Sequence, residues 1–387
     1  MDSSAHQTRV LIVGGGVAAL EAALALKHSA GDLVQTKLLA PEDEFVYRPM
    51  SVGEPFGHEA AHSYPLDRIV DDLEIERYRD TLQWVDTTAR VVHTEQEEQL
   101  EYDALLLAVG ARSYTSLRHA LTIDPTRLDE QLHGLVQDLE GGWVHNIAFV
   151  IPDLSAWPLP IYELALMTAT RAYEMNIDAR ITVVTPEEAP LQIFGSSASS
   201  AVSRRLAAYG ITTLTSSHCV MHAPRSLTVS TAPEPLEVEH VVTLPALHGP
   251  AVPGIPRSAE HGFISVDRHS RVTGLDNVFA AGDMTDFPIK LGGIAAQQAD
   301  AAAESIAALA GAAIEPQPLV ATIHGMLLSG GGPLYMRAQV SGSQGTHSRV
   351  SSDPIWTPAT KIHARYLTPR LQSIDAVAHH ADAREAF

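Results

Sequence analysis

Three consecutive glycines, Gly14, Gly15 and Gly16, are the residues whose types and spacing most directly indicate chemistry. They follow the apolar residues 10–13 and open a helical pattern that continues to Leu26. Gly14 lets the turn close, Gly16 lets the backbone approach a ligand, and the amino end of the helix attracts negative charge. A strand, a glycine turn and a helix in this order predict a phosphate site for a dinucleotide, although a purely structural turn shares the pattern.

Two other strand-like segments end in residues of similar type. Within residues 102–111, an apolar run from Ala104 stops at Gly110, and residues 278–283 are apolar up to Gly282 and Asp283. With the opening glycines, they resemble the FAD domain of the two-dinucleotide-binding-domain flavoproteins, the pyridine nucleotide-disulfide oxidoreductase-like superfamily. Type II NADH dehydrogenases and sulfide:quinone oxidoreductases are the branch of that superfamily with the nearest resemblance. The combination of the three segments is far more specific than any one of them.

The resemblance implies an α/β fold with two Rossmann-like three-layer domains and a small C-terminal region. It predicts a discontinuous FAD-binding domain made of residues 1–118 and 241–314. An NAD(P)-binding-like unit, residues 119–240, is inserted between these parts, and residues 315–387 form the C-terminal region.

The sequence itself supports this organisation by repeating a strand-helix-strand plan. A strand over residues 36–40 completes the first unit, and strands over 147–151 and 181–185 form the corresponding pair in the second. In the C-terminal region the pattern predicts a hairpin within residues 324–338 and a closing helix over residues 358–367, followed by a mobile tail.

The resemblance also predicts which residues contact FAD. Asp283 would accept hydrogen bonds from the ribityl chain, whereas capping of the next turn is its alternative role. Residues 288–298 resemble the segment beneath the isoalloxazine ring, where the positive end of a helix points at the ring. The expected FAD contacts are Gly14, Gly16, Val17, Ala18, Ala40, Glu42, Arg48, Leu82, Ala108, Gly110, Gly282, Asp283, Lys290, Gly293, Ile294 and Ala295.

The ribose position departs from the family pattern. An acid usually ends the second strand, about 20 residues past the glycines, where it binds the ribose hydroxyls. Ala40 occupies that position here, followed by Pro41 and Glu42. Glu42 or backbone groups would then hold the ribose, unless Glu42 is only a solvated loop acid. Arg48 would neutralise phosphate or stack on adenine, or is an ordinary surface arginine.

Two residues are candidates for catalysis. Lys290 resembles a lysine near the flavin in the sulfide:quinone oxidoreductase branch, where a cation would raise the flavin potential and assist proton delivery. Glu163 matches a glutamate near the flavin in several of these families and is the candidate general acid or base. A surface lysine and a first-turn glutamate that complements the helix dipole are the alternatives.

The second unit differs from the first at its phosphate-binding loop. In place of glycines, residues 152–160 contain Trp157 and three prolines. Proline lacks the amide hydrogen that binds phosphate, and tryptophan fills the space, so ordinary NAD(P)H binding is disfavoured. This unit is therefore expected to serve as scaffold and flavin lid. An unconventional NAD(P)H site with Glu187 or Glu188 near the ribose is the alternative.

Composition excludes several classes of protein. The single cysteine, Cys219, rules out an intramolecular disulfide and makes the family mechanism of sulfide oxidation improbable. A formal charge of −20 argues against nucleic acid as a partner. The 19 histidines show no metal-ligand spacing, so no metal is expected.

These observations lead to three functional hypotheses. The first is an FAD-dependent oxidoreductase that passes two electrons from a small donor to a quinone-like or other diffusible acceptor. The second keeps NAD(P)H as the donor, and the third is an FAD-bearing binding or assembly protein with residual redox activity. The polar start and the lack of a long apolar run predict a cytoplasmic protein without a transmembrane segment, and leave peripheral membrane contact and a homodimer open.

Overall fold

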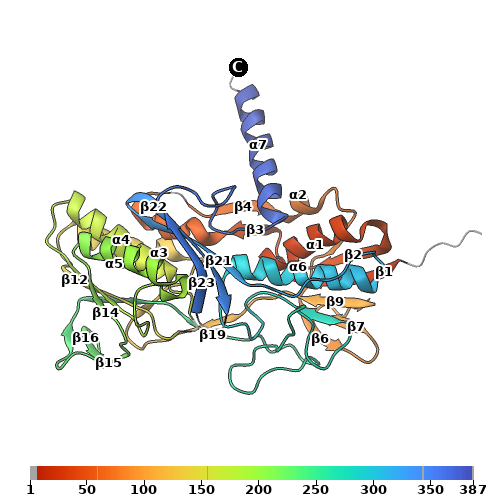
Figure 1. The fold of residues 1–387 in the computed structure, drawn as a ribbon, viewed down its shortest axis with the longest axis horizontal. Helices are drawn as coiled ribbons and strands as arrows, with labels where there is room; N and C mark the ends of the chain where they lie inside the picture. Colours follow the sequence, from red (N-terminus) through yellow and green to blue (C-terminus); the bar gives the residue numbers. More distant parts are fainter. Residues whose placement is uncertain (1–6, 59, 155, 342–343, 386–387) are drawn as a thin grey trace, which may run out of the picture.

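The computed structural model describes residues 7–58, 60–154, 156–341 and 344–385. Its first sheet is parallel, with the strand order β20-β9-β1-β2-β5 (Figure 1). The three strand ends that the sequence singled out belong to β1, β9 and β20, which are direct neighbours. The strands are β1 (Thr8–Val13), β2 (Val34–Leu39), β5 (Glu76–Tyr78), β9 (Ala104–Leu107) and β20 (Val278–Ala280).

Successive side chains of a strand point to opposite faces of the sheet, and the first sheet is covered on both faces. Val10 and Ile12 pack towards α1 (Val17–Ser29), α2 (Leu66–Val70) and α6 (Gly292–Leu309). Leu11 and Val13 pack towards an antiparallel sheet of β6 (Leu82–Asp86), β7 (Val91–Thr94) and β8 (Gln99–Glu101). This layering positions α1 and α6 side by side along one face of the first sheet (Figure 1).

The second unit repeats this architecture. Its parallel sheet has the order β11-β18-β12-β13-β14 and packs on one face against three helices. A three-stranded antiparallel sheet packs on the other face. The elements are β11 (Leu121–Thr122), α3 (Leu128–Glu140), β12 (Asn146–Val150), α4 (Leu159–Glu174), β13 (Arg180–Val184), α5 (Ser196–Ala208), β14 (Thr212–Leu214), β15 (Cys219–Ala223), β16 (Ser226–Val229), β17 (Leu236–Glu237) and β18 (His240–Thr243). The predicted α/β fold with two Rossmann-like units is therefore confirmed.

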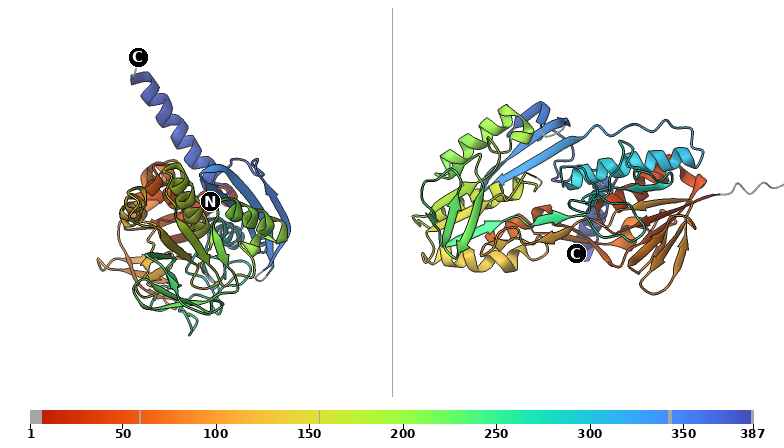
Figure 2. Two further views of the ribbon diagram at one scale, coloured as in Figure 1. Left: turned by 90° about the vertical axis from the view of Figure 1, so that its left-hand side faces the viewer. Right: turned by 90° about the horizontal axis from the view of Figure 1, so that it is seen from below.

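The two units lie end to end in an elongated molecule (Figure 2). Antiparallel pairing of β10 (Arg112–Tyr114) with β19 (Ala246–His248) joins the two passages of the chain between the units. Strand β18 belongs to the second sheet, so we propose that the chain returns to the first unit after Thr243 rather than at residue 241. A short hairpin of β3 (Glu44–Tyr47) and β4 (His62–Pro65) encloses the nine-residue 3-10 helix η2 (Arg48–Phe56). Two shorter 3-10 helices of three residues each are η1 (Gly31–Leu33) and η3 (Gln192–Phe194).

The C-terminal region contains the predicted hairpin as part of a three-stranded antiparallel sheet. Strands β21 (Thr322–Ser329), β22 (Gly331–Ser341) and β23 (Gln344–Ser351) pack on α4, α5 and η3 of the second unit. The predicted helix over residues 358–367 is wrong. That stretch is irregular, and helix α7 (Leu367–Glu385) begins where the predicted helix was to end. Pro369 lies in the first turn of α7, where its missing N–H removes no helical hydrogen bond.

Helix α7 leaves the body of the protein, with its base against α1 and α2 (Figures 1 and 2). Most of the predicted mobile tail continues this helix, and residues 386–387 lie outside the described residues. The buried Glu21 carboxylate accepts hydrogen bonds from the backbone N–H groups of Tyr366 and Leu367, at 2.9 and 2.6 Å. Asp300 lies beside it, and burial together with the charge of Glu21 raises the pKa of Asp300 to about 8. The two carboxyl groups therefore share a proton at neutral pH.

An Asp300→Asn substitution is expected to stabilise the fold at pH 8 and to have little effect at pH 4. Between these values the unfolded chain has already released the Asp300 proton, whereas the folded protein still holds it, so the wild type loses stability as the pH rises. The gain at pH 8 should be on the order of 2–4 kcal/mol in urea unfolding. The matched Asp276→Asn variant changes an exposed side chain and should show no gain. Equal unfolding midpoints for Asp300→Asn and wild type at pH 8 would contradict the shared proton.

Candidate functional site

A first cavity of about 560 Å³ opens at the carboxyl ends of the first sheet. It reaches from Leu82, past the Gly14–Gly16 turn, to Asp283. The structure brings most of the predicted contacts to this one space, although they come from five separate segments of the chain. Its lining includes Gly14, Gly16, Val17, Ala18, Glu42, Arg48, Leu82, Ala108, Gly110, Gly282, Asp283 and Ala295.

The glycine turn has the geometry of an anion site. Gly14 has φ +124° and donates its N–H to the carbonyl of Leu39 at 2.8 Å; a Cβ there would lie 2.3 Å from the carbonyl oxygen of Ala108. A Cβ on Gly16 would meet nothing within 4 Å, so this residue presents its backbone to open space. Helix α1 begins directly after Gly16, with no side-chain cap and no acidic residue in its first turn. Its amino end is therefore free to attract a phosphate.

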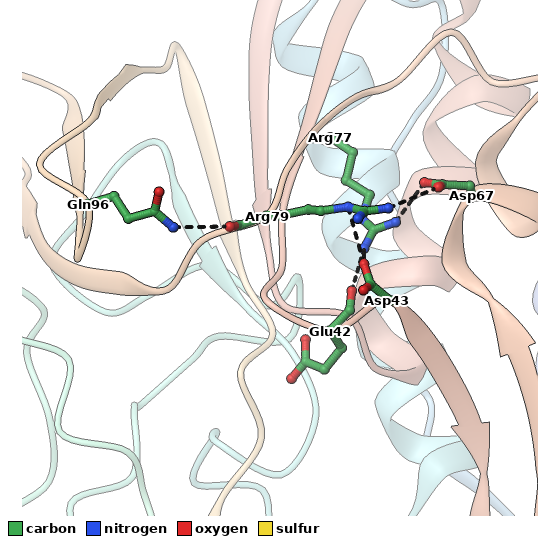
Figure 3. Close-up of polar contacts among 6 residues, drawn as sticks. All are labelled: Glu42, Asp43, Asp67, Arg77, Arg79 and Gln96. Atoms are coloured by element: carbon green, nitrogen blue, oxygen red, sulfur yellow. Dashed lines mark hydrogen bonds and ion pairs between the residues drawn. The ribbon is translucent and has the colours of Figure 1, made fainter.

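Glu42 lies over the turn, where its Oε2 atom would be 3.1 Å from a Cβ on Gly15. Figure 3 shows how the surrounding loop is fixed. The side chain of Arg77, 7% exposed, donates to the backbone carbonyl of Glu42 and pairs with Asp43 and Asp67 at 3.0 and 2.6 Å. Arg79 bridges the same two aspartates. This network holds the acid after β2 at the cavity, two residues later than the usual position.

Four predicted contacts lie outside the lining of this first cavity; one of them, Lys290, lines the second cavity described below. Ala40 is fully buried, with its Cβ 3.4 Å from the position a Cβ would take on Gly15. Gly293 and Ile294 lie within the first turn of α6, and Ile294 points into the core between α6 and its neighbours. Helix α6 begins at Gly292, two residues earlier than the sequence indicated, so Gly292 faces the cavity instead.

A second cavity of about 520 Å³ continues from the first. The two share a set of lining residues, so they form one continuous space. Beyond the shared residues, the second cavity reaches Lys290 and Glu163. The residues common to both are Gly15, Gly16, Val17, Glu42, Arg48, Ala111, Asp283 and Gly292.

Lys290 is a buried cation in the lining of the second cavity. Its Nζ atom donates to the carbonyl of Thr285 and lies 3.8 Å from the centre of the Phe263 ring. Burial lowers the pKa of Lys290 to about 8, against the opposing charges of Asp283 and Asp286. Burial in turn raises the pKa of Asp283, and Lys290 opposes that change. The alternative of a surface lysine is wrong, because Lys290 is 8% exposed.

A Lys290→Met substitution is expected to lower the reduction potential of the FAD-loaded protein at pH 7 by about 30 mV. This shift equals ~1.4 kcal/mol for two electrons, a reasonable value for one lost cation. At pH 9.5 the wild-type lysine has largely lost its charge, since its pKa lies near 8, so the two proteins should differ much less. Potentials measured with dyes at both pH values test this. If the difference in reduction potential between the two proteins grew with pH, the assignment of Lys290 as the cation near the flavin would be contradicted.

Glu163 forms a buried ion pair that the sequence did not reveal. Its carboxylate accepts from Lys361 Nζ at 2.7 and 2.8 Å and from the Leu328 N–H at 2.9 Å. The two side chains are 1% and 5% exposed. Burial raises the pKa of Glu163, and the charge of Lys361 only partly offsets this effect. The alternative of a first-turn glutamate is wrong, because α4 begins at Leu159 and its first turn contains no acidic residue. The C-terminal region supplies the partner of Glu163 from 198 residues away.

A third cavity of about 870 Å³ adjoins this pair. It lies between η2, β4, the β21–β22 hairpin and the base of α7, and its walls include Tyr47, Met50, Met326 and Tyr335. Lys361 lines both the second and the third cavity. A proton held by the Glu163–Lys361 pair is therefore accessible from both spaces.

A histidine pair was also missed by the sequence analysis. His324 lines the second cavity, and its ring centre lies 4.6 Å from that of His363. Burial, with the neighbouring His363 and Arg337, lowers the pKa of His324 to about 3. Both rings are neutral at pH 7, since the pKa of His363 is also lowered by burial. They can offer hydrogen bonds here without adding charge.

The degenerate loop of the second unit forms a wall of the second cavity rather than a phosphate site. Trp157 lines this cavity and packs edge-on against Phe194, with ring centres 5.7 Å apart. Glu187 is buried and accepts from the hydroxyls of Tyr162 and Thr185 at 2.6 and 3.0 Å. Its carboxylate is thereby committed to the interior, which counts against the alternative that it binds a ribose.

Burial raises the pKa of Cys219 to about 11, so this thiol, on β15 and far along the chain from the cavities' lining residues, is unreactive at neutral pH. The described part of the chain contains no group of three or more His, Cys, Asp or Glu that could hold a metal ion. Within the same residues, no helix is long and apolar enough to pass through a membrane.

Comparison with known proteins finds a family model that matches the first part of the chain. Residues 8–134, which contain the glycine turn and two of the three strand ends, match the model of the pyridine nucleotide-disulphide oxidoreductases. This part of the chain is similar to that family. It is a family of FAD-dependent oxidoreductases whose members typically bind FAD and NAD(P)H.

Solved structures share the fold of this protein over most of the chain. The sulfide:quinone oxidoreductase of Aquifex aeolicus superposes with a TM-score of 0.78 at 19% identity, covering 89% of this chain and 87% of that one. A ferredoxin reductase from Rhodopseudomonas palustris superposes with a TM-score of 0.63 at 18% identity, covering 87% of this chain and 83% of that one. NDH2 from Plasmodium falciparum, solved in complex with NADH, superposes with a TM-score of 0.57 at 14% identity, covering 72% of this chain and 65% of that one. At such low identities these likenesses concern the fold alone.

Proposed function

We propose that this protein binds FAD and passes two electrons from a small donor to a quinone-like or other diffusible acceptor. The observation that carries the proposal is the continuous space formed by the first and second cavities. It begins near Leu82, passes the Gly14–Gly16 turn and Asp283, and ends at Lys290 and Glu163. A turn that excludes side chains, an uncapped helix end and a carboxylate at a strand end fit the diphosphate and the sugar alcohol of FAD.

FAD supplies reversible two-electron chemistry that no amino acid side chain provides. The residues around it have separate tasks. The amino end of α1 and the glycine turn bind negative charge, Asp283 accepts hydrogen bonds from hydroxyl groups, and Lys290 places a cation at the inner end of the space. The loop of Trp157 excludes water from one side of the second cavity.

The Glu163–Lys361 pair supports a quinone-like acceptor. A quinone that takes up two electrons also takes up two protons, so its site needs a buried proton donor. Lys361 holds protons at Nζ and lines both the second and the third cavity, and Glu163 accepts two hydrogen bonds from it. The aromatic and methionine side chains around the third cavity suit an apolar ring.

Anaerobic reoxidation tests this function. FAD-loaded protein is photoreduced with EDTA as the electron donor and mixed with menadione, and the return of flavin absorbance is followed by stopped flow. We expect reoxidation about a hundredfold faster than that of free reduced FAD, the contribution expected of a positioned acid. A rate equal to that of free flavin would reject the quinone-like acceptor and favour a binding or assembly protein.

A further inference from the structure

The second sheet keeps the usual ligand-binding edge of a parallel α/β unit. In such sheets, ligands bind outside the carboxyl ends of the strands. Three neighbouring strands, β11, β18 and β12, end at the second cavity, through Ile123, Leu244 and the loop that carries Ala156 and Trp157. This edge therefore faces the same space that Lys290 and Glu163 line.

The lining that this edge contributes is almost entirely apolar. Among the described residues between 121 and 250 that line the second cavity, Glu163 is the only charged one. Three other lining residues from this range, at positions 125, 160 and 245, are prolines, which have no N–H to offer to an anion. The apolar wall consists of Ile123, Leu128, Ala156, Trp157, Leu244 and Leu247. A phosphate or carboxylate would lose its hydration at this wall, whose own residues offer it no cation; the cations of the cavity, Arg48, Lys290 and Lys361, come from other segments.

The part of this sheet edge that follows β13 is covered by the C-terminal sheet. A Cβ on Gly345 of β23 would lie 2.1 Å from the carbonyl oxygen of Ile193, and Ser348 donates to the carbonyl of Phe194. The C-terminal sheet therefore packs directly on η3, which follows β13. The carboxylate of Glu187, in the connection between β13 and η3, accepts hydrogen bonds from the hydroxyls of Tyr162 and Thr185. A ligand as long as a dinucleotide would meet this closed packing, and of the two glutamates in the connection only Glu188 is exposed.

We propose that this edge binds a small, uncharged, aromatic molecule, and that the electron donor of the proposed function belongs to this class. The inference rests on that function for the donor role, whereas binding itself can be measured independently. Trp157 provides the face on which an aromatic ring packs, since its own ring is fixed edge-on by Phe194. The former phosphate loop thus selects for a flat apolar ligand.

Calorimetric titration of the FAD-loaded full chain with 2-naphthol at pH 7 tests the site. This probe is uncharged, bicyclic and too small to need the closed part of the edge. Trp157→Ala should weaken its binding about tenfold or more, because the packed ring is lost. Leu247→Gln alters the same wall from a different strand and should weaken it as well. The matched control is Trp143→Ala, which removes a 78% exposed tryptophan of the same unit and should change nothing.

Two further titrations make the result decisive. Met50→Ala changes only the third cavity, so it should leave naphthol binding unchanged. NADH and NADPH should neither bind the FAD-loaded protein nor compete with naphthol. The inference is overturned if Trp157→Ala and Leu247→Gln bind naphthol like wild type, if Met50→Ala alone weakens it, or if NADH binds in a way that depends on Trp157. A protein that binds naphthol at Trp157 but does not reduce menadione would refute the proposed function and leave this site standing.

Discussion

Gly14→Ala is expected to abolish FAD binding and to destabilise the fold, whereas Gly16→Ala should affect FAD binding alone. A methyl group at Gly14 would lie 2.3 Å from the carbonyl oxygen of Ala108, at a φ of +124° that L side chains rarely adopt. The turn would have to move, at a cost of about 3 kcal/mol. At Gly16, with φ −90° and nothing within 4 Å, a methyl group strains nothing but occupies the space of the ligand.

The pair of variants separates folding from binding. Urea unfolding of the cofactor-free proteins should show a loss for Gly14→Ala and wild-type stability for Gly16→Ala. Titration of the same proteins with FAD should show at least about tenfold weaker binding for Gly16→Ala, because the backbone no longer reaches the diphosphate. If Gly16→Ala bound FAD as tightly as wild type, the diphosphate would have to lie elsewhere.

Glu163→Gln is expected to slow acceptor reduction by about 10²–10⁴-fold, the range for a lost acid–base group, because the carboxylate that exchanges protons with Lys361 is removed. It should also destabilise the protein by about 3–5 kcal/mol, because Lys361 is left buried without its counter-charge. The stopped-flow reaction with menadione measures the first effect, and urea unfolding measures the second.

The double variant Glu163→Gln with Lys361→Met separates the two roles of the pair. Removing both charges takes away the unpaired ion, so stability should return to near the wild-type value. The rate should stay low, because neither side chain can then deliver a proton. If the double variant regained the wild-type rate, the pair would be structural, and the proton would come from another group.

The first half of the site could be predicted from local sequence because each of its parts lies at the end of a strand. Gly14, Gly110 and Asp283 each follow a short apolar run, and parallel strands place such ends along one edge of a sheet. The sequence did not reveal which strands are neighbours, but the order β20-β9-β1 makes all three adjacent. The loss of the phosphate site in the second unit was equally local, since Trp157 and the prolines lie within one loop.

The second half could not be predicted, because its residues meet only through tertiary packing. Lys361 lies in an irregular stretch with no motif around it, and only the packing of the C-terminal region on α4 brings it to Glu163. His324 lies on β21 in an otherwise apolar pattern that is typical of a core strand. The error over residues 358–367 has a similar origin: Pro358 and Pro369 frame a helix in the sequence, but Glu21 caps the actual helix from a distant element.

A crystal structure of the protein grown with FAD is the most direct test of the central claim. The account predicts continuous density through the first and second cavities, with the diphosphate at the Gly14–Gly16 turn, hydroxyl groups at Asp283 and the ring system beside Lys290. Density for FAD at any other place, or both cavities without density at saturating FAD, would contradict it.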